Sequence, residues 1–158
     1  KGGLPLKKAV DLSDIIRESA SFSILGPGTR CEVELPGSLP AVEADEGQIS
    51  QVIHNLVINA DQAMPDGGVI RITAGVAEGQ GSGREGRFLR IRVSDTGKGI
   101  EEKNLSKVFD PYFTKKKEGS GLGLATVYSV VKNHGGFIEA KNRPEGGAVF
   151  TVVLPVSE

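Results

Sequence analysis

The segment IRVSDTGKGI, residues 91–100, places an acidic residue and two glycines directly after an apolar strand. Ile91, Val93 and Asp95 occupy alternate positions, so a strand would turn all three side chains toward one face of a sheet. A buried carboxylate must accept hydrogen bonds, and an exocyclic amine is one suitable donor. The glycines allow positive φ and close approach to the backbone. The segment therefore predicts a buried acid beside a loop that fits a flat ligand, with a simple turn-capping role for Asp95 as the alternative.

Hydrophobic periodicity on both sides of this segment predicts a mixture of helices and strands. One expected helix lies within residues 6–22, with its apolar spacing from Leu12 onward and with Asp11 or Ser13 able to cap its start. The other expected helices cover residues 46–64 and 123–134. The expected strands cover residues 30–36, 40–45, 69–76, 87–95, 136–142 and 146–155. The strands that flank the glycine-rich loop 77–86 should form a hairpin. Because helices and strands do not alternate strictly, the pattern favours an α+β sandwich whose mixed or antiparallel sheet is covered by helices on one face.

Composition narrows the classes of protein to consider. The 158 residues match the size of one domain, and 19 Lys and Arg against 20 Asp and Glu argue against nucleic acid or an anionic membrane as partner. Cys31 is the only cysteine, which excludes an internal disulfide and a cysteine-based zinc site. The sequence contains no signal peptide and no apolar run of the roughly 20 residues that a membrane span needs. With one cysteine and no targeting segment, we expect a cytoplasmic location. Because the chain begins at Lys1 without an initiator methionine, we also expect it to be a fragment of a larger protein.

A stripe of neutral amides follows the long central helix. Gln51, Asn55, Asn59 and Gln62 lie at helical spacing, where a solvated face would normally carry Lys and Glu. A carboxamide oxygen can join the oxygen shell of Mg²⁺ and repels a triphosphate less than a carboxylate does. The alternative is a polar face packed under a loop, and the stripe alone leaves both interpretations open.

A second glycine segment, GSGLGLATV at residues 119–127, lies directly before the last helix. Backbone N–H groups and the helix dipole at such a start favour an anion such as phosphate. The lysine-rich run 114–117 lies just upstream and adds positive charge. No strand precedes these glycines, and the isolated Gly97–Lys98 pair lacks the rest of a P-loop. A flexible hinge is the alternative interpretation of the glycines.

Together these segments resemble the ATP-binding domain of sensor histidine kinases. Residues 51–63 resemble its asparagine box, residues 95–100 its first glycine box, residues 108–125 its phenylalanine box and second glycine box, and residues 146–155 its last strand. The similarity covers about residues 40–156. This domain is shared with gyrase, a heat-shock chaperone and mismatch-repair ATPases. The segments FDPYFTKK and AMPDGG suggest a nitrogen-regulation-like branch of the sensor kinases.

The resemblance implies a fold and a domain plan. The fold is a two-layer α/β sandwich of the Bergerat type, with a mixed, mostly antiparallel sheet of about five strands covered on one face by about three helices. Residues 1–158 form a single catalytic and ATP-binding domain. Residues 1–10 are the remnant of a linker from an upstream dimerisation and phospho-acceptor domain.

The resemblance also assigns roles within the site. Asp95 accepts from the adenine amino group, Asn59 binds Mg²⁺, and Asn55 helps to orient the metal and water or phosphate, so that both asparagines are catalytic. An ATP lid spans residues 101–118, anchored by Phe109 and Phe113. The residues expected around ATP and Mg²⁺ are Asn55, Asn59, Gln62, Asp95, Gly97, Gly99, Ile100, Thr114, Lys115, Lys116, Gly119, Ser120, Gly121, Leu122, Gly123 and Leu124.

Two departures from the family pattern bear on mechanism. Many relatives carry Lys or Arg where this chain has Gln62, so Lys115 or Lys116 is expected to contact phosphate instead. The hydrolytic members carry a general-base Glu where this chain has Asn55, so water is poorly activated and the γ-phosphate is kept for another acceptor.

The expected function is an ATP-dependent protein histidine kinase of a two-component phosphorelay. Neither His54 nor His134 has the sequence context of a phospho-acceptor, so the accepting histidine should lie upstream and the isolated chain should not autophosphorylate. The expected partners are that upstream histidine domain and a response regulator receiver domain, in a homodimeric parent that is free or anchored to a membrane. The alternatives are an ATPase clamp or protein serine kinase of the same superfamily, and a non-catalytic nucleotide-binding module.

Overall fold

The computed structural model describes residues 4–23, 25–78, 86–111 and 123–157. In these residues the helices are α1 (Ser13–Phe22), α2 (Glu46–Gln62) and α3 (Gly123–Asn133), with a short 3₁₀ helix η1 (Glu102–Asn104). The strands are β1 (Lys8–Val10), β2 (Thr29–Glu34), β3 (Val42–Ala44), β4 (Gly68–Glu78), β5 (Arg87–Ser94), β6 (Phe137–Asn142) and β7 (Ala148–Pro155). None of the helices in these ranges is long and apolar enough to cross a membrane.

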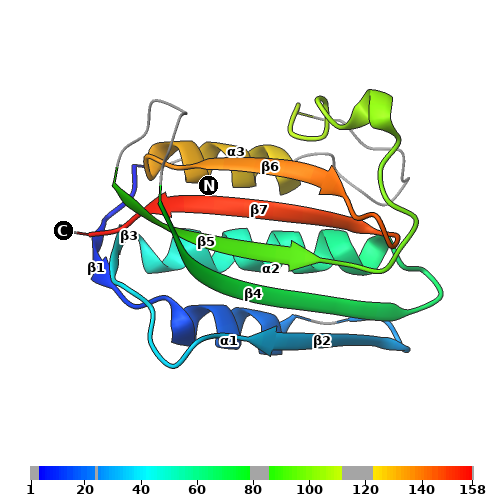
Figure 1. Ribbon diagram of the computed structural model, residues 1–158, viewed down its shortest axis with the longest axis horizontal. Coiled ribbons are helices and arrows are strands. Elements are labelled where there is room, and N and C mark those ends of the chain that lie inside the picture. The colour runs from blue at the N-terminus through cyan, green and yellow to red at the C-terminus, as the bar shows by residue number, and fades with distance from the viewer. Residues whose placement is uncertain (1–3, 24, 79–85, 112–122, 158) are drawn as a thin grey trace.

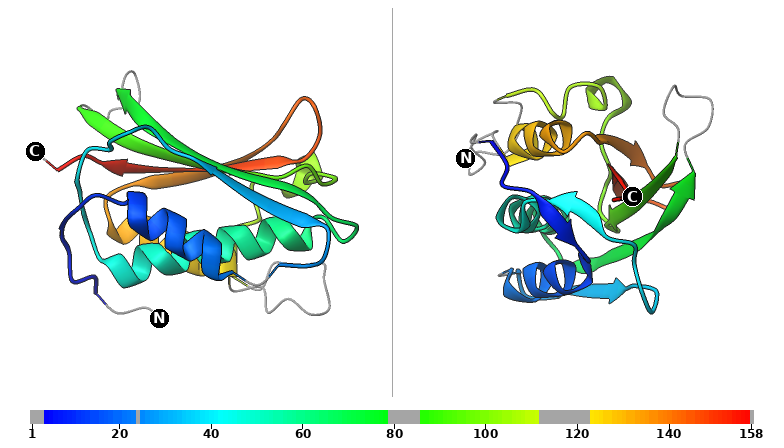
Figure 2. Two further views of the ribbon diagram at one scale, coloured as in Figure 1. Left: turned by 90° about the horizontal axis from the view of Figure 1, so that it is seen from below. Right: turned by 90° about the vertical axis from the view of Figure 1, so that its left-hand side faces the viewer.

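Five strands form the main sheet in the order β2-β4-β5-β7-β6, as far as the described ranges extend. β2 pairs with β4 in parallel, and the other neighbours are antiparallel. The three α-helices lie side by side on one face of this sheet, which gives two layers (Figure 1, Figure 2). The predicted α+β sandwich is confirmed, including the β4–β5 hairpin around the glycine-rich loop.

One strand was not predicted. Lys8–Val10, which precedes the predicted helix start, forms β1 and pairs antiparallel with β3 in a separate two-stranded sheet. The helix begins at Ser13, close to the predicted start, and the Asp11 side chain accepts a hydrogen bond from the Ser13 backbone N–H at 2.9 Å. Partner strand β3 decides the conformation of this stretch, and no local periodicity reports such a partner.

The core explains why the acid after β5 is buried. Leu89, Ile91 and Val93 alternate along β5 and are at most 1% exposed, because they face the helices. Asp95 continues the same row and is 2% exposed, as its spacing predicts. The strand therefore carries the carboxylate to the helix-covered side of the sheet, beside the end of α2.

The ends of α2 and α3 are tied together at one side of the helix layer. Asp45 caps α2 by accepting from Gln48 N, and it also accepts from Leu6 N at 2.8 Å. The Leu6 hydrogen bond, followed by that of Gln48, holds the pKa of Asp45 below its ordinary value. His134, directly after α3, is buried and accepts from Asp45 N at 3.0 Å through Nε2. Its Nδ1 therefore carries the proton and donates to the Val130 carbonyl at 2.8 Å.

Candidate functional site

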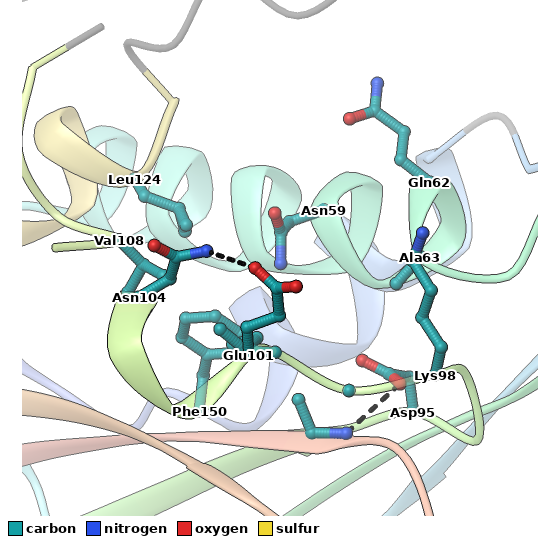
Figure 3. A pocket seen from close by; sticks show the side chains of 13 residues that line it. Asn59, Gln62, Ala63, Asp95, Lys98, Glu101, Asn104, Val108, Leu124 and Phe150 are labelled. Atoms are coloured by element: carbon teal, nitrogen blue, oxygen red, sulfur yellow. Dashed lines mark hydrogen bonds between the residues drawn. The ribbon is translucent and has the colours of Figure 1, made fainter. Parts of the chain in front are cut away.

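A cavity of about 500 Å³ lies between the C-terminal part of α2, the loop that follows β5 and the start of α3 (Figure 3). Most of its polar groups come from α2 and the loop, whereas its apolar wall comes from several elements. Its lining residues are Asn59, Gln62, Ala63, Asp95, Lys98, Gly99, Ile100, Glu101, Asn104, Val108, Leu124, Ala148 and Phe150. Six residues of the predicted site are therefore brought to one place: Asn59, Gln62, Asp95, Gly99, Ile100 and Leu124.

The carboxylate at the bottom of the cavity is held rigidly. Oδ1 of Asp95 accepts from the backbone N–H groups of Gly97 at 2.9 Å and Ala148 at 3.2 Å. These hydrogen bonds offset part of the free-energy cost of burying the carboxylate and fix its orientation. Gly97 itself does not line the cavity; a Cβ there would collide with the Ala63 carbonyl at the end of α2. The glycine at position 97 is needed for this packing, whereas Gly99 lines the cavity. The close approach of a ligand to either glycine stays a prediction.

The β6–β7 turn supports the cavity loop from outside. The side chain of Asn142 brackets the backbone of Ile100, accepting from its N–H at 2.7 Å and donating to its carbonyl at 2.6 Å. Arg143 donates through Nη1 to the Asp95 carbonyl at 2.7 Å. The turn thus fixes both ends of the segment that runs from the buried acid to Ile100.

The amide side chains of the stripe on α2 lie against different neighbours. Asn59 and Gln62 line the cavity, but Asn55 donates to the Gly123 carbonyl at the start of α3, at 3.2 Å. Gln51 lies in a separate groove against α1. The helix contacts a different element at each turn, so side chains on one stripe meet different surroundings. The structure therefore gives Asn59 the position predicted for a ligand-facing amide and gives Asn55 a helix-to-helix contact.

Several predicted site residues lie outside the described ranges. They are Thr114, Lys115, Lys116, Gly119, Ser120, Gly121 and Leu122, together with the lid residue Phe113. Gly123 is described and begins α3, next to Leu124 in the cavity wall. Phe109, the other predicted lid anchor, packs against the domain: its ring centroid is 5.9 Å from that of Tyr128 on α3 and 6.0 Å from that of Phe150 on β7. Its role in a lid stays a prediction.

Sequence reasoning missed seven lining residues, which are Ala63, Lys98, Glu101, Asn104, Val108, Ala148 and Phe150. Ala148 and Phe150 lie on β7, a strand that was predicted, but their approach to Asp95 depends on the β5–β7 pairing. Glu101 precedes a 3₁₀ turn of three residues and Asn104 ends it, in a stretch with weak periodicity. No sequence signal reports which way such side chains point.

The arrangement suits a planar group that carries a hydrogen-bond donor. The apolar side chains of Ile100, Val108, Leu124 and Phe150 can cover a flat ring, while Asp95 offers a buried acceptor for its donor. Within the described ranges, no three His, Cys, Asp or Glu side chains gather as a metal site. A single amide oxygen at Asn59 fits a Mg²⁺ ion that takes most of its oxygen ligands from phosphates and water.

The chain is similar in sequence to one family of known proteins. Residues 44–158 match the family described as histidine kinase-, DNA gyrase B- and HSP90-like ATPase. The sensor histidine kinase ZraS of Escherichia coli (strain K12) is 39% identical over 154 residues, which cover 95% of this chain and 31% of that protein. The sensor kinase CckA of Brucella abortus (strain 2308) is 33% identical over 159 residues, covering 94% of this chain and 17% of that protein. The chain thus spans a third or less of the length of these relatives.

Solved structures extend the comparison. The catalytic domain of histidine kinase ThkA, solved without nucleotide, has a TM-score of 0.75 and 31% identity, covering 95% of each chain. Full-length ShkA in complex with AMPPNP has a TM-score of 0.78 and 25% identity, covering 99% of this chain and 32% of that one. The chain therefore belongs to the histidine kinase-, DNA gyrase B- and HSP90-like ATPase family, as a homologue of the sensor histidine kinases.

Proposed function

We propose that the chain binds ATP with Mg²⁺ in this cavity and delivers the γ-phosphate to a histidine in another domain of its parent protein. The observation that carries the proposal is the cavity itself, which is lined by the buried Asp95 carboxylate and by the Asn59 amide. The AMPPNP complex of the homologue ShkA supports ATP as the ligand.

In this proposal the residues that line the cavity act by holding the nucleotide in place. Asp95 accepts from the adenine amino group, and the apolar wall covers the ring. Asn59 contributes an oxygen to Mg²⁺, which neutralises charge on the phosphates. Positioning and charge neutralisation dominate phosphoryl transfer, so little covalent chemistry is asked of the chain. Lys115 or Lys116 remains the proposed phosphate cation.

The acceptor is proposed to lie in an upstream domain because both histidines of the chain have other contacts. His54 is exposed on α2, with Nδ1 3.1 Å from the Ser23 hydroxyl. His134 is buried against Asp45 at the other end of α2. Neither lines the cavity. Hydrolysis is disfavoured because Asn55, which is no general base, holds the start of α3.

The wider assignment follows the relatives. We propose that the parent is a homodimeric sensor kinase whose phosphohistidine domain passes the phosphoryl group to a response regulator. Three further expectations stay predictions. They are the cytoplasmic location of this domain, its extent over residues 1–158, and its place in a nitrogen-regulation-like branch of the sensor kinases.

The first test combines binding and labelling. Calorimetric titration with ATP should show binding that strengthens with Mg²⁺, and Asn59→Ala should remove most of this Mg²⁺ dependence while ATP still binds without metal. Incubation with γ-labelled ATP should leave the isolated chain unlabelled. Stable label on His54 or His134, or an unchanged Mg²⁺ dependence in Asn59→Ala, would contradict the proposal. Gln51→Ala, on the same helix but outside the cavity, is the matched control.

A further inference from the structure

An exposed asparagine outside the cavity makes two short hydrogen bonds to the cavity wall. Asn142 is the last residue of β6, and it does not itself line the cavity. Its Oδ1 accepts from the Ile100 N–H at 2.7 Å, and its Nδ2 donates to the Ile100 carbonyl at 2.6 Å. Only one orientation of the amide satisfies both groups, so this side chain fixes the backbone of a residue that lies 42 positions away along the chain.

The loop that Asn142 holds contains a glycine with positive φ. Gly99 has φ +81° and, like Ile100, it lines the cavity. A Cβ at position 99 would lie 2.7 Å from Oδ1 of Asn142, so the amide packs directly against the glycine. Glycine loses more backbone freedom on ordering than any other residue. Hydrogen bonds that order this loop before a ligand arrives therefore remove part of the entropic cost of binding.

A role confined to the β6–β7 turn is the competing interpretation. The turn closes through its own backbone, since Arg143 N donates to the Gly147 carbonyl at 2.8 Å and Gly146 N donates to the Arg143 carbonyl at 3.1 Å. Asn142 is also paired with Ala148 in the β6–β7 ladder. These contacts use main-chain groups, whereas the Asn142 side chain is directed at the cavity loop. The geometry therefore favours a role at the cavity.

We propose that Asn142 is a positioning residue for nucleotide binding. It raises the affinity for ATP by holding Gly99 and Ile100 in the cavity wall before the nucleotide binds, and it acts only through this loop. The inference rests on the proposed function, because it needs a nucleotide in this cavity. Asn59, the proposed ligand to Mg²⁺, lies on α2, so the effect of Asn142 should not depend on the metal.

The first test removes the side chain amide. Asn142→Ala should weaken ATP binding about 10-fold in calorimetry, by the same factor with Mg²⁺ and with EDTA, because two hydrogen bonds that order the loop are lost. Amide hydrogen exchange at Ile100 should become faster in the nucleotide-free protein. Lys141→Ala changes the neighbouring exposed residue of β6 and is the matched control. It should alter neither the affinity nor the exchange rate.

The second test keeps the shape of the side chain and changes one atom. In Asn142→Asp the new carboxylate can still accept from the Ile100 N–H, but its second oxygen faces the Ile100 carbonyl and repels it. This repulsion raises the pKa of the new carboxyl, and a proton on it restores the donor. ATP affinity relative to the wild type should therefore be low at about pH 7.5 and recover toward about pH 5.

Other charged groups near this contact are controlled by the same comparison. Lys98 on the loop and Lys141 and Arg143 on the hairpin keep their charge over this pH range. Titration of Glu101, of Glu145 and of ATP itself is shared with the wild type, so it cancels in the ratio of affinities. Asn142→Ala should show a constant ratio to the wild type over the same range, because it offers no group that could regain the donor.

Three results overturn the inference. They are unchanged ATP affinity in Asn142→Ala, a loss that appears only with Mg²⁺, and the absence of recovery at low pH in Asn142→Asp. The recovery separates the hydrogen bond to Ile100 from general loosening of the turn, which the alanine variant would share. Failure of the wild type to bind any adenine nucleotide would instead overturn the proposed function itself.

Discussion

Replacing Asp95 with asparagine is expected to lower the affinity for ATP by on the order of 100-fold with the fold retained. The amide oxygen can still accept from Gly97 N and Ala148 N, the two bonds that anchor this side chain. The amide nitrogen then takes the place of the second carboxylate oxygen. It is a donor, and a donor facing the adenine amino group leaves both without a partner in a buried site.

Calorimetric titration measures the affinity of the Asp95→Asn variant for ATP, and urea unfolding measures its stability. The free energy of unfolding should change by no more than about 1 kcal/mol, because the backbone bonds survive. The ratio of GTP to ATP affinity should rise, since the new amide can donate to a carbonyl on guanine. Asp66→Asn removes the same charge from the exposed turn after α2 and should change neither affinity. Unchanged ATP binding in a folded Asp95→Asn variant would contradict the adenine role.

Gly147→Ala is expected to destabilise the fold by about 3 kcal/mol or more. Gly147 is buried with φ +90°, a region that L side chains rarely adopt. A Cβ there would collide with the Asp95 carbonyl and lie 3.0 Å from Asp95 Oδ1. The acid and the loop behind it would have to move, so nucleotide affinity should fall together with the free energy of unfolding.

Gly146, the neighbouring glycine, provides a control that distinguishes the cost of backbone strain from the cost of this collision. Gly146 has φ +112° in the same turn, but a Cβ there meets no atom within 4 Å. Gly146→Ala should therefore cost about 1 kcal/mol of unfolding free energy and leave nucleotide affinity unchanged. Both energies come from chemical denaturation. Equal losses in the two variants would show that contact with Asp95 contributes nothing.

The fold could be predicted where the chemistry is local and periodic. The alternation in β5 and the three-to-four spacing in α2 predicted both elements, and the Ile91–Val93–Asp95 row correctly predicted which side of the sheet the acid faces. β1 was missed because its conformation depends on a partner more than thirty residues away, paired from Lys8 to Ala44. The parallel pairing of β2 with β4 has no sequence signal of its own for the same reason.

The residues of the candidate site could likewise be predicted only where they belong to a local motif. Asp95, Asn59 and Gly99 belong to motifs that can be read from the chain, and all three line the cavity. Glu101 could not be predicted, because a single 3₁₀ turn has no repeating pattern from which to infer direction. The predicted role of Asn55 at the metal and phosphate stays a prediction. The sequence did not indicate that its amide would donate to the Gly123 carbonyl, because that partner lies 68 residues away along the chain.

The His134 contact with Asp45 has a mechanical consequence for the helix layer. It joins α3 to α2 at the end away from the cavity, whereas Leu124 lines the cavity at the other end of α3. Any motion of α3 that preserves this contact is a swing about its C-terminal end, with a lever arm of roughly 15 Å from His134 to Leu124. Occupancy of the cavity would then be converted into an angle between two helices, largest where Asn55 meets Gly123.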